Sequence, residues 1–429
     1  MRDRSKDRWA GSVFADSRAL KPGAVSRGAH LSRSDISNHT AHRRLSRRKT
    51  HIVTKRPPFE RIALLLQGGG ALGAYQAGVY QVLTEANLHP DWVAGISIGA
   101  INSALIAGNP PGKRVERLRE FWEMVITSPF GVPYVAALKA RDEFSHSVIN
   151  QASSWSALLG GAPGFFQPRV PPPFLYPNGS PKALSYYDVA PLKATLERLV
   201  DFDLINRGRM RFSVGAVNVQ TGNFVYFDNT THQICGAHVM ASGSLPPGLP
   251  PTEIEGEYYW DGGLVSNTPL NWVLESRPRR DTLAFQIDLW NARGEFPRNL
   301  IEADTRQKEI RYSSRTRLAS SEFKNRQILR RAAYRLLAGL PKELLQTPEA
   351  EMLALEADEK VYNLIQLIYH AKNYEGNSKD YEFSRETMEE HWRSGYNDAV
   401  HTLRHPEVLQ RPQGLDGVFT FDLAVDGRE

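Results

Sequence analysis

One serine of this 429-residue chain lies in a sequence pattern that could support nucleophilic catalysis. Ser97 is the central residue of Gly95-Ile96-Ser97-Ile98-Gly99, a G-x-S-x-G motif that is typical of a nucleophile elbow. In such an elbow the serine lies on a sharp strand-to-helix turn, where small flanking residues avoid a clash and leave the hydroxyl exposed. The motif therefore indicates attack of this hydroxyl on a carbonyl carbon.

A glycine-rich segment upstream of the elbow could supply the second requirement of acyl transfer, which is a set of donors for the developing oxyanion. Gly68, Gly69 and Gly70 follow the apolar run Ile62–Leu66, and Gly73 comes three residues later. Backbone N–H groups at a helix N-terminus, with no side chain in the way, are suited to hold negative charge. We therefore expect the three successive glycines to contribute to an oxyanion hole.

The same glycines also fit two other interpretations. Gly68-x-Gly70-x-x-Gly73 between a strand and a helix matches a dinucleotide-binding fingerprint, which needs an acidic residue at the end of the second strand. Ile96-Ser97 occupies that place, and Asp91 comes before the strand instead of after it. Both glycine clusters could otherwise be simple turns, but their separation by a single βα unit favours a catalytic pairing.

Apolar spacing predicts the elements that position these motifs. Strands are expected over 62–66, 92–94, 211–219, 224–227 and 258–260, and helices over 73–87, 100–107, 112–127 and 188–200. Asp261 ends the last of these strands and precedes Gly262 and Gly263, so its carboxylate is well placed to reach the elbow of a neighbouring strand.

A proline-rich stretch over 160–187 contains seven prolines interleaved with aromatic residues such as Phe165 and Phe166. Loops of this length are often functional. The stretch fits either a lid or lipid-facing wall, or a loop whose aromatic side chains pack on the core.

Taken in order, these motifs resemble those of the patatin-like phospholipases. The matching residues are Gly68-Gly69-Gly70-Ala71-Leu72-Gly73, the elbow at 95–99, the segment 241–246 and Asp261-Gly262-Gly263, so the resemblance covers about 64–270. It implies a three-layer α/β/α fold, a lipid acyl-ester substrate and a Ser-Asp dyad, with Ser97 as nucleophile and Asp261 as base. Leu72 departs from the family, because many members carry a basic residue there, but backbone donors do not depend on that side chain.

Residues 276–429 are expected to form a C-terminal extension, similar to that of a bacterial subgroup of patatin-like proteins. One strand over 281–290 and helices over 306–339, 348–369 and 384–403 are predicted. Within the first of these helices, Ile328–Leu337 combines an apolar stripe with a basic face, which suits either a membrane surface or packing on the protein. The predicted organisation is a tail over 1–58, a catalytic domain over 59–275 and this extension.

The basic character of the chain belongs to its N-terminal tail. The first 56 residues contain 15 Lys and Arg and 4 Asp, a net charge of +11, so the remainder carries −5 of the total of +6. We expect the tail to be disordered, and to be either a solvated extension or a contact for anionic lipid or nucleic acid, although no specific nucleic acid is expected. No apolar segment follows Met1, so a secretory signal is not supported, and the aspartates weaken a likeness to a transit peptide.

Other compositional features exclude several classes of chemistry. Cys235 is the single cysteine, so an intrachain disulfide is excluded and a reducing compartment is favoured. No His, Cys, Asp or Glu cluster has metal-ligand spacing, so neither a metal nor another cofactor is expected. No run of about 18 apolar residues occurs, so a membrane-spanning helix is not expected. These features predict a cytoplasmic protein with at most peripheral contact with an anionic membrane.

The expected function is hydrolysis of lipid acyl esters by an enzyme of the phospholipase A or lysophospholipase type. The N–H groups of Gly69, Gly70 and Ile98 would bind the oxyanion formed when Ser97 attacks and Asp261 accepts its proton. The alternatives are an esterase acting on polyester or thioester, and a non-catalytic lipid- or protein-binding module on the same fold. A Ser-acid-His triad would need a late histidine, and all candidates lie in the expected extension: His370, His391, His401 and His405.

Overall fold

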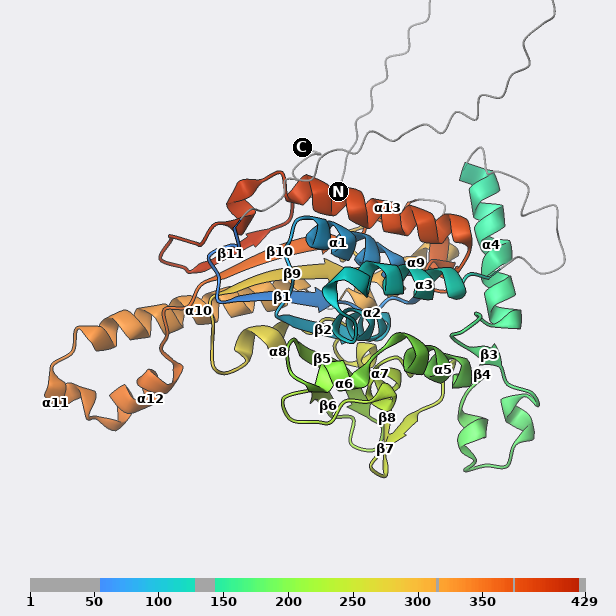
Figure 1. The fold of residues 1–429 in the computed structure, drawn as a ribbon, viewed down its shortest axis with the longest axis horizontal. Helices are drawn as coiled ribbons and strands as arrows, with labels where there is room; N and C mark the ends of the chain where they lie inside the picture. Colours follow the sequence, from blue (N-terminus) through green and yellow to red (C-terminus); the bar gives the residue numbers. More distant parts are fainter. Residues whose placement is uncertain (1–54, 128–142, 314–315, 373–374, 424–429) are drawn as a thin grey trace, which may run out of the picture. The chain divides into compact units, whose positions relative to one another are not determined.

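The computed structural model describes residues 55–127, 143–313, 316–372 and 375–423, which form a mixed α/β fold around one large sheet (Figure 1). Residues 1–54 of the predicted tail lie outside the described residues. The predictions made for that segment are therefore not tested by the structure.

The large sheet contains nine strands among the described residues. From one side to the other the order is β11 (Val418–Phe421), β10 (Tyr362–Ile368), β9 (Thr282–Asp288), β1 (Arg61–Leu66), β2 (Trp92–Ile96), β5 (Arg211–Asn218), β8 (Glu257–Asp261) and β7 (Thr252–Ile254), with β6 (Phe224–Asp228) also paired to β5. Neighbouring strands from β11 to β5 are parallel, whereas β6, β7 and β8 form antiparallel pairs. The sheet is thus mostly parallel, and the predicted strands all occur in it.

Apolar residues on both faces of β1 are buried, and they belong to two different clusters. Ile62, Leu64 and Leu66 pack with α1 (Ala74–Glu85), α2 (Ile98–Ala107), α3 (Arg114–Met124), α5 (Ala190–Leu199), α6 (Phe202–Asn206), α7 (Gly236–Ser242) and α13 (Arg385–Thr402). Ala63 and Leu65 point the other way, toward α8 (Leu270–Glu275) and α10 (Thr316–Ala338). This alternation confirms the predicted three-layer α/β/α fold, because side chains on one strand point alternately to opposite faces.

The register of the parallel strands places the two catalytic motifs side by side. Leu66, the last residue of β1, pairs with Gly95 of β2 on one side and with Ile287 of β9 on the other. The glycine-rich turn after β1 and the elbow after β2 therefore lie next to each other at the carboxyl ends of the strands. This is the part of an open α/β sheet where ligands usually bind.

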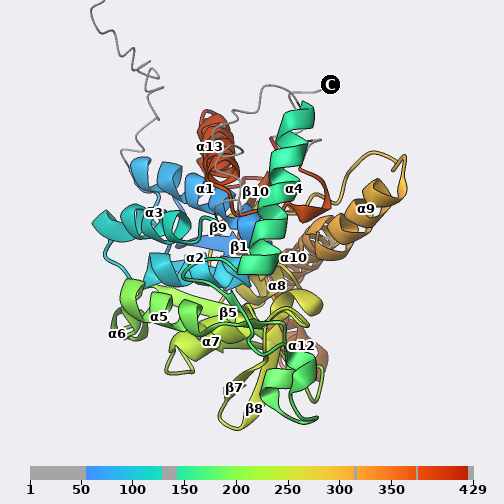
Figure 2. The same ribbon diagram turned by 90° about the vertical axis from the view of Figure 1, so that its right-hand side faces the viewer.

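The proline-rich stretch is built around a short antiparallel pair of strands, β3 (Gln167–Pro168) and β4 (Tyr187–Asp188). Between them lie two short 3₁₀ helices, η3 (Pro173–Leu175) and η4 (Pro181–Leu184). Helix α4 (Glu143–Gly160) precedes the stretch and was not predicted. Figure 2 shows α4 and α9 (Leu300–Tyr312) near the carboxyl ends of the parallel strands.

The prediction of one helix over 348–369 was wrong in its second half. Helix α12 (Pro348–Glu356) ends early, and the chain then forms β10 between β9 and β11. All seven residues of β10 are buried, because neighbouring strands and helices cover every side of it. Such a strand lacks the polar and apolar alternation by which strands are recognised.

Other parts of the extension also differ from expectation. It contributes three strands to the sheet instead of one, and the predicted helix over 306–339 is divided into α9 and α10. The last helix, α13, confirms the prediction over 384–403. The remaining short elements are α11 (Lys342–Leu345), η1 (Gly70–Gly73), η2 (Pro111–Lys113), η5 (Gly262–Leu264), η6 (Gly376–Ser378) and η7 (Pro406–Leu409).

Helix α10 packs on the protein with a face that differs from its predicted apolar stripe. Phe323, Gln327 and Arg330 point inward, and the guanidinium of Arg330 forms an ion pair with Glu275 at 2.5 Å. Leu329, by contrast, is 70% exposed. The basic residue is therefore part of the contact with α8, while part of the apolar stripe faces outward.

Helices α1 and α13 approach each other unusually closely, which joins the extension to the catalytic region. A Cβ atom on Gly78 would lie 2.0 Å from the carbonyl oxygen of Trp392. In the same way, a Cβ atom on Gly395 would lie 2.0 Å from the carbonyl oxygen of Tyr75. Real Cβ atoms do not approach oxygen so closely, so both contacts require glycine.

We expect the substitution Gly78→Ala to lower the free energy of unfolding by about 3 kcal/mol, because the two helices would have to separate. Urea denaturation measures this change. Gly112→Ala is the matched control, since nothing lies within 4 Å of an added Cβ atom there, and its stability should stay close to that of wild type. Equal stabilities of the two variants would contradict the close packing of α1 and α13.

Candidate active site

Ser97 lies on a strained turn between β2 and α2, as the sequence predicted. Its φ is +55° and its ψ is −123°, a backbone conformation that residues other than glycine rarely adopt. Added Cβ atoms would lie 2.2 Å from the Gly99 carbonyl oxygen if placed on Gly95, and 2.2 Å from the Leu66 carbonyl oxygen if placed on Gly99. Both flanking glycines are therefore required by the tight approach of backbone across the turn.

Ser242 holds this strained turn from the side of α7. The N–H of Ser97 donates to the Ser242 carbonyl oxygen at 3.1 Å and to its Oγ at 3.0 Å. The Ser242 hydroxyl in turn donates to the carbonyl oxygen of Gly215 in β5, at 2.6 Å. Segment 241–246, which carried part of the resemblance, thus supports the elbow, a role that its sequence alone did not reveal.

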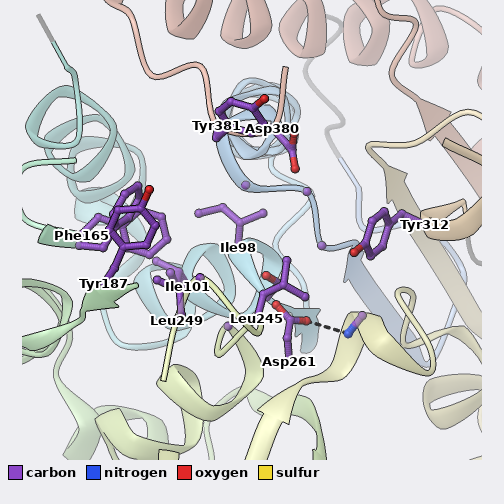
Figure 3. Close-up of a pocket in the computed structure, with 18 of the residues that line it drawn as sticks. Ile98, Ile101, Phe165, Tyr187, Leu245, Leu249, Asp261, Tyr312, Asp380 and Tyr381 are labelled. Carbon is purple, nitrogen blue, oxygen red and sulfur yellow. Dashed lines mark hydrogen bonds between the residues drawn. The ribbon is translucent and has the colours of Figure 1, made fainter. Parts of the chain in front are cut away.

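Asp261 ends β8 and is 2% exposed, in the cavity that also holds Ser97 (Figure 3). Its Oδ1 accepts a hydrogen bond from the N–H of Gly263 at 2.7 Å. Burial raises the pKa of Asp261 from its ordinary value of 3.8 to about 6, although hydrogen bonds from the Ser97 hydroxyl and the Gly263 N–H oppose this shift. The carboxylate is therefore a stronger base than an aspartate in water.

The glycine-rich turn borders the same cavity. In the part of the chain that the structure describes, the N–H groups of Gly69, Gly70 and Ile98 have no protein acceptor. The N–H of Gly68 differs, because it donates to the Asn267 carbonyl oxygen at 3.3 Å. Gly68 is thus a poor choice for the oxyanion donor that we predicted, and three of the four predicted donors are left.

Buried polar side chains fix the backbone of this turn, and sequence reasoning missed them. The amide oxygen of Gln67 accepts from the N–H groups of Leu289 and Trp290, at 2.6 and 2.9 Å. The amide group of Asn267 donates to the Gly68 carbonyl oxygen at 3.0 Å and to that of Tyr312 at 2.8 Å. Gln67 was the one such residue that the sequence could have indicated, because it directly follows an apolar strand and a polar residue at such a position is usually buried.

Some of the motif glycines border the cavity, and the others lie outside it. Gly68, Gly69, Gly70 and Gly263 line it together with Ser97, Ile98 and Asp261. Gly73, Gly95, Gly99 and Gly262 lie outside the cavity, where an added Cβ atom would come within 2.6 Å of neighbouring atoms.

The cavity has a volume of about 320 Å³ and a mostly apolar wall drawn from distant parts of the chain (Figure 3). Phe165 and Phe166 of the proline-rich stretch line it and contact the ring of Phe383, with centroids 6.0 and 6.2 Å away. These aromatic residues therefore pack on the core, as the second interpretation predicted, and they also form part of the cavity wall.

The extension contributes more to the cavity than the sequence indicated. Its residues on the wall are Trp290, Tyr312, Asp380, Tyr381 and Phe383. None of the described histidines lines the cavity, including the four late candidates for a triad. The described residues contain no group of three His, Cys, Asp or Glu side chains that could hold a metal ion, and no helix among them could span a membrane.

Comparison with known proteins agrees with this geometry. A family model described as "Patatin-like phospholipase" matches residues 64–273, and a second, described as "Patatin phospholipase", matches residues 310–415. The chain belongs to the patatin-like phospholipase family. We refer to the two matched segments as the first and the second patatin region. The first contains Ser97 and Asp261, and the second contains the wall residues Asp380, Tyr381 and Phe383.

Individual relatives match over short segments. "Patatin-like phospholipase domain-containing protein 6" of Homo sapiens is 40% identical over 67 residues, which is 16% of this chain and 5% of that protein. "Lysophospholipase nte1" of Aspergillus terreus is 44% identical over 57 residues, or 13% of this chain and 4% of that protein. The chain thus matches only a small part of the length of these relatives. Among solved structures, VipD from Legionella pneumophila is similar with a TM-score of 0.37 and 16% identity, over 85% of this chain and 72% of that chain.

We expect Asp261→Asn to stabilise the fold at pH 8 by roughly 3 kcal/mol, because a raised pKa means that ionisation of the buried carboxylate costs stability. With a folded pKa of about 6 and an ordinary value of 3.8, wild type has its full stability below pH 3.8 and loses this contribution as the pH rises through 6. Asparagine cannot ionise, so the gain in stability should develop between pH 3.8 and 6 and stay constant at higher pH. Thermal denaturation from pH 4 to 8 measures it.

Asp203→Asn serves as the control for this measurement, because Asp203 is exposed on α6. It should show a small stability difference that does not follow the window from 3.8 to 6. A pH-independent difference for Asp261→Asn would contradict the raised pKa.

Proposed function

We propose that the chain is a serine hydrolase of lipid acyl esters, with Ser97 as nucleophile and Asp261 as its base. The observation that carries this proposal is the meeting, in one apolar cavity, of a serine on a strained elbow with a buried carboxylate whose pKa is raised by burial. The family supplies the substrate class, since patatin-like phospholipases act on lipid acyl esters. Phospholipase A and lysophospholipase activity are the specific forms that we favour.

The reaction follows from the positions of these groups. The Ser97 Oγ attacks the ester carbonyl carbon while Asp261 accepts the hydroxyl proton, and the N–H groups of Gly69, Gly70 and Ile98 bind the oxyanion. Collapse of the tetrahedral intermediate breaks the ester bond, and the protonated Asp261 gives its proton to the leaving alkoxide. Water then attacks the acyl-serine, Asp261 accepts a proton from it, and the fatty acid leaves as the serine is restored.

The apolar wall favours an acyl chain as the group held beside the serine. Phe165 and Leu245, together with Ile101 of α2, offer no charge and few hydrogen bonds to a polar substrate. The alternative substrates, a polyester or a thioester with an apolar acyl part, would meet the same apolar wall. Assays on the three ester types separate these substrates, and a lipid ester is the one that we expect to be cleaved fastest.

We expect Ser97→Ala and Asp261→Asn each to reduce hydrolysis of a soluble short-chain ester by at least about 10³-fold. Ser103→Ala is the matched control, because Ser103 is a buried serine on α2, the helix that follows Ser97, and does not line the cavity. That control should keep wild-type activity.

In the wild-type protein, kcat should decrease when the pH is lowered below about 6, since a protonated Asp261 cannot accept the serine proton.

Two outcomes would contradict the assignment. Activity of Ser97→Ala near that of wild type would favour the non-catalytic binding module. A folded His391→Ala variant as inactive as Ser97→Ala would instead favour a triad, because His391 is the late histidine nearest to the glycine-rich turn, with Nδ1 3.4 Å from the Ala71 carbonyl oxygen.

We also propose that the protein contacts a lipid surface with the helix beside the cavity. Leu158 of α4 lines the cavity, while its neighbours Trp155 and Leu159 are 55% and 73% exposed. These two side chains are four residues apart, so they lie on one face of the helix. Exposed apolar side chains next to a lipid-binding cavity are suited to insertion among lipids.

Replacing both Trp155 and Leu159 by serine should reduce hydrolysis of phospholipid vesicles several-fold more than hydrolysis of a soluble short-chain ester, since neither residue lines the cavity. The control replaces Met352 and Leu353 of α12, which are 70% and 43% exposed and lie far from α4 in Figure 1. Equal losses on vesicles and soluble ester would show that α4 has no special contact with lipid.

A further inference from the structure

A loop of the second patatin region contacts the glycine-rich turn through its backbone. The N–H of Ala71 donates to the Asp380 carbonyl oxygen at 2.8 Å. Gly70 has a φ of +54°, and a Cβ atom placed on it would lie 2.0 Å from the same carbonyl oxygen. This carbonyl group therefore lies directly against the residue whose free N–H we assign to the oxyanion.

The side chain of Asp380 forms an ion pair with Lys308. The Nζ of Lys308 in α9 lies 2.5 Å from the Asp380 Oδ1 and donates to the Asn377 carbonyl oxygen at 3.2 Å. Lys308 and Asp380 are 23% and 19% exposed, so the pair is better shielded than a surface salt bridge. The lysine also lies over two rings of the cavity wall, 5.7 Å from Trp290 and 5.3 Å from Tyr381.

The residue before Asp380 is held by the same helix. The Nζ of Lys379 is 4% exposed and lies 2.5 Å from Oε1 of Glu309, the residue after Lys308. Two successive residues of α9 thus hold two successive residues of the loop. Figure 3 shows Asp380 and Tyr381 on the side of the cavity opposite Asp261, so this loop faces the reacting groups across the cavity.

We propose that Lys308 and Asp380 are positioning residues for the hydrolysis assigned above, on which this inference rests. Their ion pair fixes the position of the Asp380 carbonyl group. That carbonyl group in turn fixes the conformation of the glycine-rich turn, and with it the positions of the N–H groups of Gly69 and Gly70. Oxyanion stabilisation depends on donors that are in place before the reaction, and small displacements of such groups are costly. The second patatin region thereby takes part in catalysis without supplying a group that touches the reacting atoms.

The ion pair is not needed to hold the extension on the protein. Helix α13 is joined to the catalytic region by its close packing on α1, by the hydrogen bond from Tyr75 to Asp398 at 2.8 Å, and by the ion pair between Arg119 and Glu389 at 2.8 Å. Loss of the Lys308 charge should therefore shift the glycine-rich turn without releasing the extension. This separates a role in positioning from a role in general stability.

The decisive variant is Lys308→Met in the full chain, assayed on a soluble short-chain ester. We expect kcat to fall about tenfold, less than for removal of an oxyanion donor, while KM stays within about twofold. Affinity for a short alkyl trifluoromethyl ketone, whose adduct carries an oxyanion, should fall by the same factor as kcat. Lys308→Arg should restore most of the activity, because it restores the charge.

Asp380→Asn provides a second variant that keeps the backbone carbonyl group and the size of the side chain. Its kcat should also fall, and the double variant with Lys308→Met should lose no more than either single variant, because the two residues act as one pair. Lys360→Met is the matched control. It breaks the ion pair with Glu60, 2.9 Å long, near the start of β10 and far from the carboxyl ends of the strands, so kcat should not change.

Ser97→Ala, measured in parallel, distinguishes the two ways in which the inference can fail. If Ser97→Ala is inactive and Lys308→Met and Asp380→Asn both keep the wild-type kcat, the positioning role is wrong and the hydrolase assignment holds. If Ser97→Ala is as active as wild type, the hydrolase assignment is wrong and the positioning role falls with it. Additive losses in the double variant, or loss of activity only together with loss of thermal stability, would also overturn the positioning role.

Discussion

The burial of the Asp261 carboxylate is the interaction on which the rest of the site depends. In water an aspartate is too weak a base to accept a serine proton, and burial raises its pKa to about 6. The same burial costs stability whenever the carboxylate is ionised, so the surrounding fold must hold it in place. Hydrogen bonds from Gly263 and Ser97 offset part of that cost, and both come from the elements that form the site.

The wall of the cavity that holds this carboxylate is not built by the first patatin region alone. The wall opposite Asp261 comes from the loop with Tyr381 and Phe383, and another part comes from Tyr312 at the end of α9. Burial raises the pKa of Tyr312, the Arg311 charge opposes this shift, and the Asp261 charge adds to it. The extension therefore lines the same cavity as the proposed base.

Contiguous motifs in the sequence were sufficient to predict the elbow at Ser97, the place of Asp261 and most of the central sheet. Each depends on neighbours in the chain, since a G-x-S-x-G motif determines its own turn and short apolar runs predict strands. The contact between Ala71 and Asp380 could not be found in this way, because more than three hundred residues separate them and Asp380 belongs to no recognisable motif. Strand β10 was missed for another physical reason, since burial on all sides removes the alternation by which a strand is recognised.

Backbone contacts between the two patatin regions show why they cannot be treated as independent modules. Gly70 and Gly78 of the first region lie where a Cβ atom would meet a carbonyl oxygen of the second, and Gly395 of the second lies where a Cβ atom would meet one of the first. Each contact is possible only because one chain segment lacks a side chain at the point where the other approaches. Glycine in a helix interior costs stability by itself, so Gly78 and Gly395 have a favourable effect only when both regions are docked. The glycine-rich turn with Gly70 follows the same rule, because a side chain at that position would displace the Asp380 carbonyl group that lies against it.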